Sequence, residues 1–77
     1  MGKQIRLELQ ATLKRFLPAA CEYYPIECGI RVRDLLAQLG IAEYEVNIVF
    51  INGTPANLDS TIEGGEKVVL YPPLGGG

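Results

Sequence analysis

The chain has 77 residues, a formal net charge of −2 and an apolar share of 48%, which predicts one small domain with little room for a deep substrate pocket. It contains no histidine and two cysteines, so it offers neither the commonest general base nor the four ligands of a structural zinc site. Its seven basic residues are scattered, which argues against direct nucleic-acid binding. No apolar run approaches the roughly 18 residues of a membrane span. The first residues lack a signal-peptide pattern, so we expect a cytoplasmic protein.

The first third of the chain predicts two strands separated by a helical turn. Strict alternation from Lys3 to Gln10 is typical of a half-buried strand. The alternation stops over residues 11–17, where we expect a short helical turn that packs three apolar side chains inward, namely Leu13, Phe16 and Leu17. A second strand is expected within Cys21 to Cys28, at a sheet edge because Pro25 lacks a backbone donor.

One clear helix is predicted from Val32 to Leu39. Its apolar residues recur at i, i+3, i+4 and i+7 and form a single stripe, made of Val32, Leu35, Leu36 and Leu39. Gly40 stands where a left-handed cap is favoured. Arg31 is a poor N-cap residue, which Asp34 in the first turn compensates in part.

The last third predicts a hairpin and a final strand. Residues 45–51 are strongly strand-forming, and Asn52-Gly53 is a hairpin signal leading to a short return over residues 54–56. Residues 59–65 are rich in turn formers, and residues 67–71 form the last strand. The whole pattern predicts an α+β fold of the β-grasp type, with a mixed sheet of four to five strands and one main helix across one face.

The two long C-terminal strands are apolar on both sides. We expect one side to belong to the core, with Val49, Ile51, Val68 and Leu70. A single helix covers only one face of the sheet, so the other side is expected to expose a contiguous apolar patch of Ile48, Phe50, Val69 and Tyr71. Such patches mark binding surfaces. The alternative is that the N-terminal segment covers this second face.

The chain ends in Pro72-Pro73-Leu74-Gly75-Gly76-Gly77. We expect a domain over residues 1–71 and a flexible tail over residues 72–77. Two prolines favour an extended path and three glycines leave the backbone thin enough to enter a narrow channel. The carboxylate of Gly77 is therefore the expected reactive group. The alternative is a merely disordered tail.

Several motifs together resemble a known family. They are Ala11-Thr12-Leu13-Lys14-Arg15-Phe16-Leu17-Pro18, Val32-Arg33-Asp34-Leu35-Leu36, Phe50-Ile51-Asn52-Gly53, Gly64-Gly65-Glu66-Lys67-Val68, and the segment from Leu70 to Gly77. In this combination the chain resembles the ubiquitin-like sulfur carriers, and its Pro-Pro pair is most similar to the small subunit of molybdopterin synthase.

The resemblance implies a carrier without catalytic groups of its own. A ubiquitin-activating-type adenylyltransferase, using ATP and Mg, would adenylate Gly77, and a sulfur donor would convert it to a thiocarboxylate. Gly76 matches the penultimate glycine of the family. The tail that carries the thiocarboxylate would enter the large subunit of molybdopterin synthase. Contacts with the partner are expected from Phe50, Val69, Tyr71, Pro73, Leu74 and Gly75. The free protein is expected to be a monomer with no bound cofactor.

Other functions stay open. Arg31 and Gly75 depart from the pattern of many relatives, which leaves thiamine, tRNA thiolation, cysteine or tungsten-cofactor pathways as alternatives. The second hypothesis is a protein modifier that is conjugated to its targets through Gly77. An electron-carrying β-grasp module is disfavoured, because an iron–sulfur cluster needs four cysteines. Cys21 and Cys28 are expected to be free, buried structural thiols, although Cys28 near a helix start is a candidate for a lowered pKa.

Overall fold

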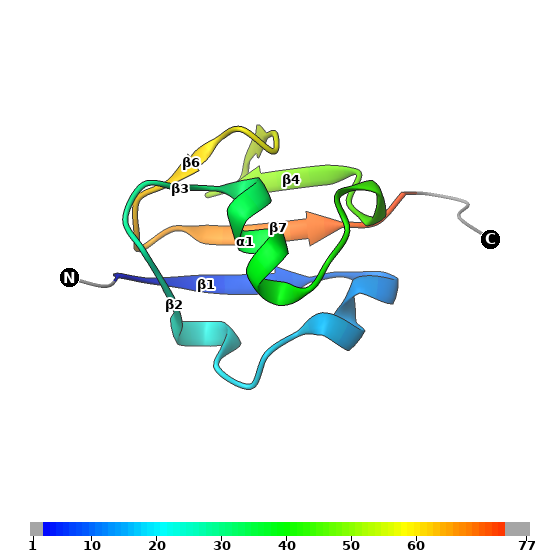
Figure 1. The fold of residues 1–77 in the computed structure, drawn as a ribbon, viewed down its shortest axis with the longest axis horizontal. Helices are drawn as coiled ribbons and strands as arrows, with labels where there is room; N and C mark the ends of the chain where they lie inside the picture. The colour runs from blue at the N-terminus through cyan, green and yellow to red at the C-terminus, as the bar shows by residue number, and fades with distance from the viewer. Residues whose placement is uncertain (1–2, 74–77) are drawn as a thin grey trace.

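The computed structural model describes residues 3–73, which form a mixed sheet of five strands with one main helix across it (Figure 1). The sheet order is β2-β1-β7-β4-β5. Its strands are β1 (Lys3–Leu9), β2 (Tyr24–Ile26), β4 (Ile48–Ile51), β5 (Thr54–Ala56) and β7 (Lys67–Tyr71). β1 and β7 are parallel and central, and the other pairs are antiparallel. The predicted β-grasp arrangement is confirmed.

The helix α1 (Val32–Leu39) has the predicted bounds. Gly40 adopts the left-handed conformation with φ of 77°, and the N–H of Ile41 donates to the carbonyl of Leu36 at 2.9 Å, as expected of a C-terminal cap. At the other end the N–H of Arg31 donates to Asp34 Oδ2 at 3.0 Å. Asp34 thus supplies the capping interaction that the residue at the N-cap lacks.

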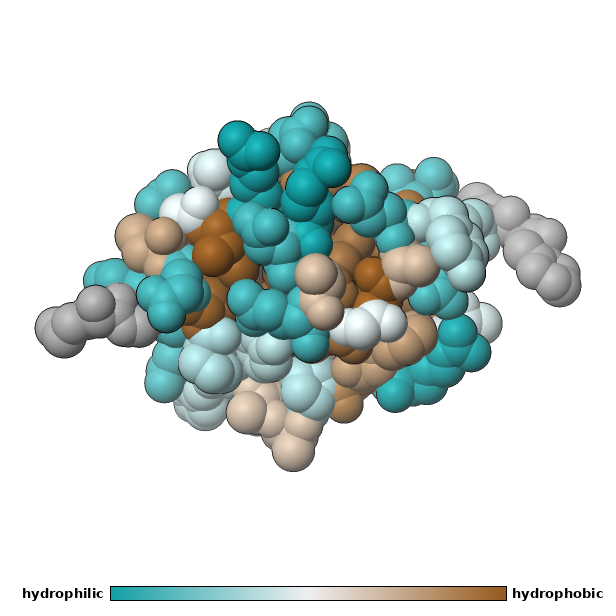
Figure 2. Space-filling view, viewed as in Figure 1, coloured by the Kyte–Doolittle hydropathy of each residue, from teal (hydrophilic) through white to brown (hydrophobic). Residues whose placement is uncertain are grey.

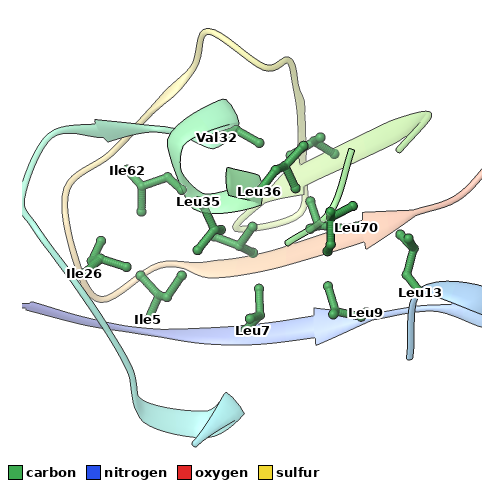
Figure 3. Packing of buried hydrophobic residues seen from close by; sticks show 13 residues of the cluster. Ile5, Leu7, Leu9, Leu13, Ile26, Val32, Leu35, Leu36, Ile62 and Leu70 are labelled. Atoms are coloured by element: carbon green, nitrogen blue, oxygen red, sulfur yellow. The ribbon is translucent and has the colours of Figure 1, made fainter. Parts of the chain in front are cut away.

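The core lies between α1 and one face of the sheet (Figure 3). The first strand contributes Ile5, Leu7 and Leu9, and the helix contributes Val32, Leu35 and Leu36. The prediction that the strand with Pro25 lies at a sheet edge is confirmed, because β2 is the outermost strand on one side of the sheet. Figure 2 shows the molecular surface in the orientation of Figure 1. Hydrophilic residues cover much of this surface, and apolar residues are visible between them.

Two predicted strands are shorter in the structure. Residues 21–23 form the 3₁₀ helix η2 (Cys21–Tyr23), so the second strand begins at Tyr24. Residues 43–45 form the 3₁₀ helix η3 (Glu43–Glu45), in which Glu45 Oε2 accepts the N–H of Ala42 at 3.2 Å. That local hydrogen bond competes with strand pairing, and β4 begins only at Ile48.

One small sheet was not predicted. β3 (Ile30–Arg31) pairs antiparallel with β6 (Thr61–Ile62) in the segment that was expected to be turns. Ile62 is fully buried and Ile30 packs against the core. Two residues cannot show a periodic pattern, so this strand depends on its distant partner.

The prediction that Leu17 packs inward is wrong. The helical turn exists as the 3₁₀ helix η1 (Ala11–Phe16), with Leu13 buried and Phe16 partly buried, but Leu17 is 40% exposed. A 3₁₀ helix has three residues per turn. Leu13 and Phe16 therefore share a face, and Leu17 is turned away from it. No helix within residues 3–73 has the length and apolarity to cross a membrane.

Candidate partner-binding face

The face of the sheet opposite α1 carries the predicted apolar patch. Side chains alternate along a strand, so the burial of Val49, Val68 and Leu70 against the helix directs their neighbours to the other side. There Ile48 is paired with Tyr71, and Phe50 with Val69. The open face therefore joins two strands that are neighbours in the sheet but distant in the chain.

The exposure of the patch is uneven. Tyr71 is 37% and Ile48 40% exposed, Phe50 is half-buried, and Val69 is only 9% exposed. The rings of Phe50 and Tyr71 pack edge to face, with centroids 5.8 Å apart and an interplanar angle of 81°. This geometry is favourable for aromatic pairs. Val69, which is paired with Phe50 on the neighbouring strand, therefore contributes little accessible surface.

The core prediction for the two long C-terminal strands holds for three of its four residues. Val49, Val68 and Leu70 are at most 3% exposed, as predicted. Ile51 packs against the core but is only half-buried. It lies at the end of β4, opposite Thr54 beside the hairpin turn, where fewer elements cover it.

A shallow hollow of about 310 Å³ lies on the open face. It is lined by Glu8, Phe50, Gly53, Lys67, Val69 and Tyr71. Apolar side chains thus occur beside one acidic and one basic residue, and Lys67 Nζ lies 3.6 Å from Glu8 Oε2. Aromatic side chains at a partly covered surface are typical of protein interfaces.

β7 carries the chain from this face toward the predicted tail. The carbonyl of Tyr71 accepts the N–H of Asn47 at 2.8 Å, and the carbonyl of Leu70 accepts that of Gln10 at 3.1 Å, so the strand is held to its end. Pro72 is half-buried and Pro73 is exposed. The other tail residues singled out from the sequence, Leu74 to Gly77, lie outside the described residues. Their roles stay predictions, as do the partner contacts of the patch.

An ion pair links the 3₁₀ helices η1 and η3. Arg15 of η1 lies 2.9 Å from Glu45 Oε1 of η3, and the Arg15 guanidinium carbon lies 4.8 Å from the centre of the Phe16 ring. Figure 1 shows both helices at the end of the molecule toward which β7 points. The exposed pair has a small stabilising effect and joins the two loops at that end.

The start of β7 is positioned by Asn52, which sequence reasoning noted only as a turn residue. Asn52 has φ of 54° and Gly53 of 78°, as a tight hairpin turn requires. Asn52 Oδ1 accepts the N–H of Lys67 at 2.9 Å, and its own N–H donates to the carbonyl of Lys67 at the same distance. The Asn-Gly pair was a visible signal for the turn, but its contact with a residue 15 positions later was not.

The cysteines are free, as predicted, but Cys28 is not a buried thiol. Cys21 is half-buried and packs against the core, whereas Cys28 is exposed. The Cys28 thiol donates to Glu63 Oε1 at 3.3 Å. This hydrogen bond to the carboxylate, together with desolvation and the negative charge of Glu63, raises the pKa of Cys28. The suggestion of a lowered pKa is therefore wrong, because the loop that carries Glu63 approaches the thiol.

The described part of the chain holds no group of three or more His, Cys, Asp or Glu side chains placed to bind a metal ion. The arrangement on the open face is a surface for contact, built from apolar side chains and a few charges, and it lies on the strand that leads to the tail.

Solved structures that share this fold include the following three. The HVO 2177 protein of Haloferax volcanii has a TM-score of 0.74 and 20% identity, over 99% of this chain and 88% of that one. A putative molybdopterin converting factor, subunit 1, from Pyrococcus furiosus has a TM-score of 0.62 and 20% identity, over 94% and 99%. SAMP1 from Haloferax volcanii has a TM-score of 0.63 and 21% identity, over 96% and 99%.

These identities support a common fold, and the resemblance to ubiquitin-like carriers is confirmed at that level. No curated protein matched the sequence. A family model described as Mut7-C ubiquitin matches residues 2–75, which is nearly the whole chain. The motifs, the β-grasp sheet and this match agree, and the chain belongs to the Mut7-C ubiquitin family.

Proposed function

We propose that this protein is a ubiquitin-like sulfur carrier that acts in the cytoplasm and delivers sulfur to molybdopterin synthesis through a thiocarboxylate at Gly77. The observation that carries the proposal is the path of β7. The strand presents Val69 and Tyr71 on the open face and continues directly into the Pro72-Pro73 segment. A partner that docks on this face would therefore receive the tail from the same strand.

The proposed chemistry uses two partners, because the terminal carboxylate must be activated before it can accept sulfur. A terminal carboxylate is ionised at neutral pH, with a pKa of about 3.3 to 3.7, and is a poor electrophile. An adenylyltransferase using ATP and Mg would join a carboxylate oxygen of Gly77 to the α-phosphate and release pyrophosphate. A donor of hydrosulfide would then form the carbon–sulfur bond and release AMP and a proton. The oxidation state of sulfur does not change in this exchange.

The likeness to a molybdopterin converting factor subunit and the Pro-Pro-Leu-Gly-Gly-Gly sequence support the molybdopterin branch. In this branch the tail would enter the large synthase subunit and give its sulfur to a pterin precursor. Thiamine, tRNA thiolation and tungsten-cofactor pathways need the same thiocarboxylate and differ in the acceptor.

The test is intact mass spectrometry of the untagged protein recovered from its own host. We expect a fraction in which one oxygen is replaced by sulfur, and its absence from a variant that lacks Gly77. A native chain that continues beyond Gly77 without being processed, or a carboxylate that stays unmodified with activating enzyme, ATP and sulfur donor present, would refute the proposal.

A pair of point variants tests whether the open face takes part in docking. Phe50→Asp places a charge in the centre of the patch and should slow charging of the tail, whereas Ala19→Asp adds the same charge in an exposed turn and should not. Both variants must retain the spectrum of a folded protein. Equal rates of thiocarboxylate formation in the two variants would show that the open face takes no part in activation of the tail.

A protein modifier is the second candidate, favoured by the description of the family as a ubiquitin. It shares adenylation of Gly77 but transfers the carbonyl carbon to a lysine amine. Higher-mass species that survive denaturant and depend on Gly77 would support the modifier. The thiocarboxylate without such species would support the carrier.

A further inference from the structure

Two cations lie side by side on the open face of the sheet. Arg6 of β1 and Lys67 of β7 are register partners on parallel strands. Each precedes a residue whose side chain is buried on the helix side, Leu7 and Val68, so both cations point to the open face. Like charges at neighbouring cross-strand positions repel each other. Glu8 offsets part of this repulsion through its ion pair with Lys67.

Only one of the two cations forms an ion pair within the described residues. Lys67 Nζ lies 3.6 Å from Glu8 Oε2, in a pair that is 49% and 41% exposed. Within residues 3–73, Arg6 forms no ion pair. Its guanidinium has five donors in a planar fork that matches a carboxylate.

The cations lie at a second hollow that adjoins the apolar one. This hollow has a volume of about 330 Å³ and is lined by Gln4, Ile5, Arg6, Glu22, Tyr23, Asn52, Gly65 and Lys67. Lys67 also lines the hollow that contains Phe50, Val69 and Tyr71. Alternate residues on one face of a strand are about 7 Å apart, so the cation pair begins about 7 Å from Val69.

We propose that the open face docks a protein partner that presents a carboxylate side chain beside an apolar one. The carboxylate binds between Arg6 and Lys67 and relieves their repulsion. The apolar side chain occupies the hollow over Phe50, Val69 and Tyr71. Glu22, which also lines the cationic hollow, limits the excess of positive charge and disfavours a polyanion. The inference extends the proposed function by naming the chemistry of the partner surface, and it rests on that function only for the partner being a protein.

The test uses a small probe that carries both features. Phenylbutyrate has an aromatic ring and a carboxylate joined by a three-carbon spacer, and phenylbutyramide is its neutral counterpart. Each is titrated into the full chain and followed by nitrogen–proton correlation NMR. We expect the shifts to map to β1, β4 and β7, and the acid to bind about two- to five-fold more tightly than the amide, as one exposed ion pair allows. Added salt should remove that difference.

Matched arginine variants identify the cation. Arg6→Gln should weaken the acid about two- to five-fold and leave the amide unchanged. Arg31→Gln is the control, because Arg31 is exposed in β3 of the other sheet. Equal binding of acid and amide, or equal effects of the two variants, would overturn the inference, as would tighter binding of a short oligothymidylate through Arg6. The readout needs no sulfur chemistry, so a failure of the thiocarboxylate test leaves this result interpretable.

Discussion

A single methyl group at Gly64 should destabilise the fold strongly. Gly64 has φ of +125°, and a Cβ added there would lie 2.5 Å from Cβ and 2.7 Å from Cγ of Lys3. Carbon atoms pack best at about 3.5 to 4.0 Å, so the overlap must displace β1 or the turn. The turn itself is held by Glu66, whose carboxylate accepts the N–H of Glu63 and of Gly64 at 2.8 and 2.6 Å. Gly65, with φ of +86°, has open space where its Cβ would lie.

The cost of the backbone conformation and the cost of the steric overlap can be estimated separately. A residue with a Cβ in a sparsely populated backbone region costs about 1–3 kcal/mol, and overpacking of one carbon costs about 1–3 kcal/mol. Gly64→Ala should therefore lower the free energy of unfolding by about 2–6 kcal/mol. Gly65→Ala carries only the backbone term, about 1–2 kcal/mol. A domain of this size has a total stability of about 4–12 kcal/mol, so the first variant should be largely destabilised and the second still folded.

Urea unfolding followed by circular dichroism measures both losses by linear extrapolation. Lys3→Gly removes the atoms that the new methyl group meets, so a double-mutant cycle isolates the overlap. We expect Lys3→Gly to recover about 1–3 kcal/mol of the Gly64→Ala loss and to recover none of the Gly65→Ala loss. Equal losses at both glycines, or no coupling with Lys3, would refute the reasoning.

Three further predictions concern the core, the helix cap and the exposed thiol. Leu36→Ala should lower the free energy of unfolding by about 2–5 kcal/mol, because Leu36 is fully buried; urea unfolding measures this, and a loss below about 1 kcal/mol would contradict the packing. Asp34→Ala should cost about 1 kcal/mol by removing the acceptor of the Arg31 N–H, seen as a lower midpoint of thermal unfolding. Alkylation of Cys28 by iodoacetamide, followed by mass spectrometry against pH, should have a midpoint above the ordinary thiol value because its pKa is raised. Glu63→Gln should move that midpoint down, and an unchanged midpoint would contradict the assigned cause.

Elements with a local signal were predicted closely. The apolar stripe of α1 and the glycine at its end need only the helix period and a left-handed cap, and the helix has the expected bounds. The Asn52-Gly53 turn likewise depends on two positive φ angles. Both signals are contained within a few residues, so the sequence alone was sufficient.

Elements that depend on a distant partner were missed or misplaced. β6 exists because Thr61 and Ile62 meet β3, and Cys28 has a raised pKa because Glu63 lies beside it. Leu17 was expected inside because it is apolar, but the 3₁₀ geometry of η1 turns it outward. None of these outcomes is encoded in periodicity.

The candidate face shows the same division. The apolar character of residues 48–51 and 67–71 on both sides, read with a single helix, already indicated that one side of the sheet would stay open. By itself the sequence thus determined the helix, the hairpin turn and the composition of the patch, because period and turn chemistry are local properties. Only the tertiary structure decided that Arg6 lies beside Lys67, that Val69 is nearly covered and that Gly64 meets Lys3. The Arg6–Lys67 contact follows from the parallel register of β1 and β7, and the position of Val69 beside Phe50 follows from the antiparallel register of β4 and β7. Such pairings join segments that are distant in the chain and leave no trace in either segment alone.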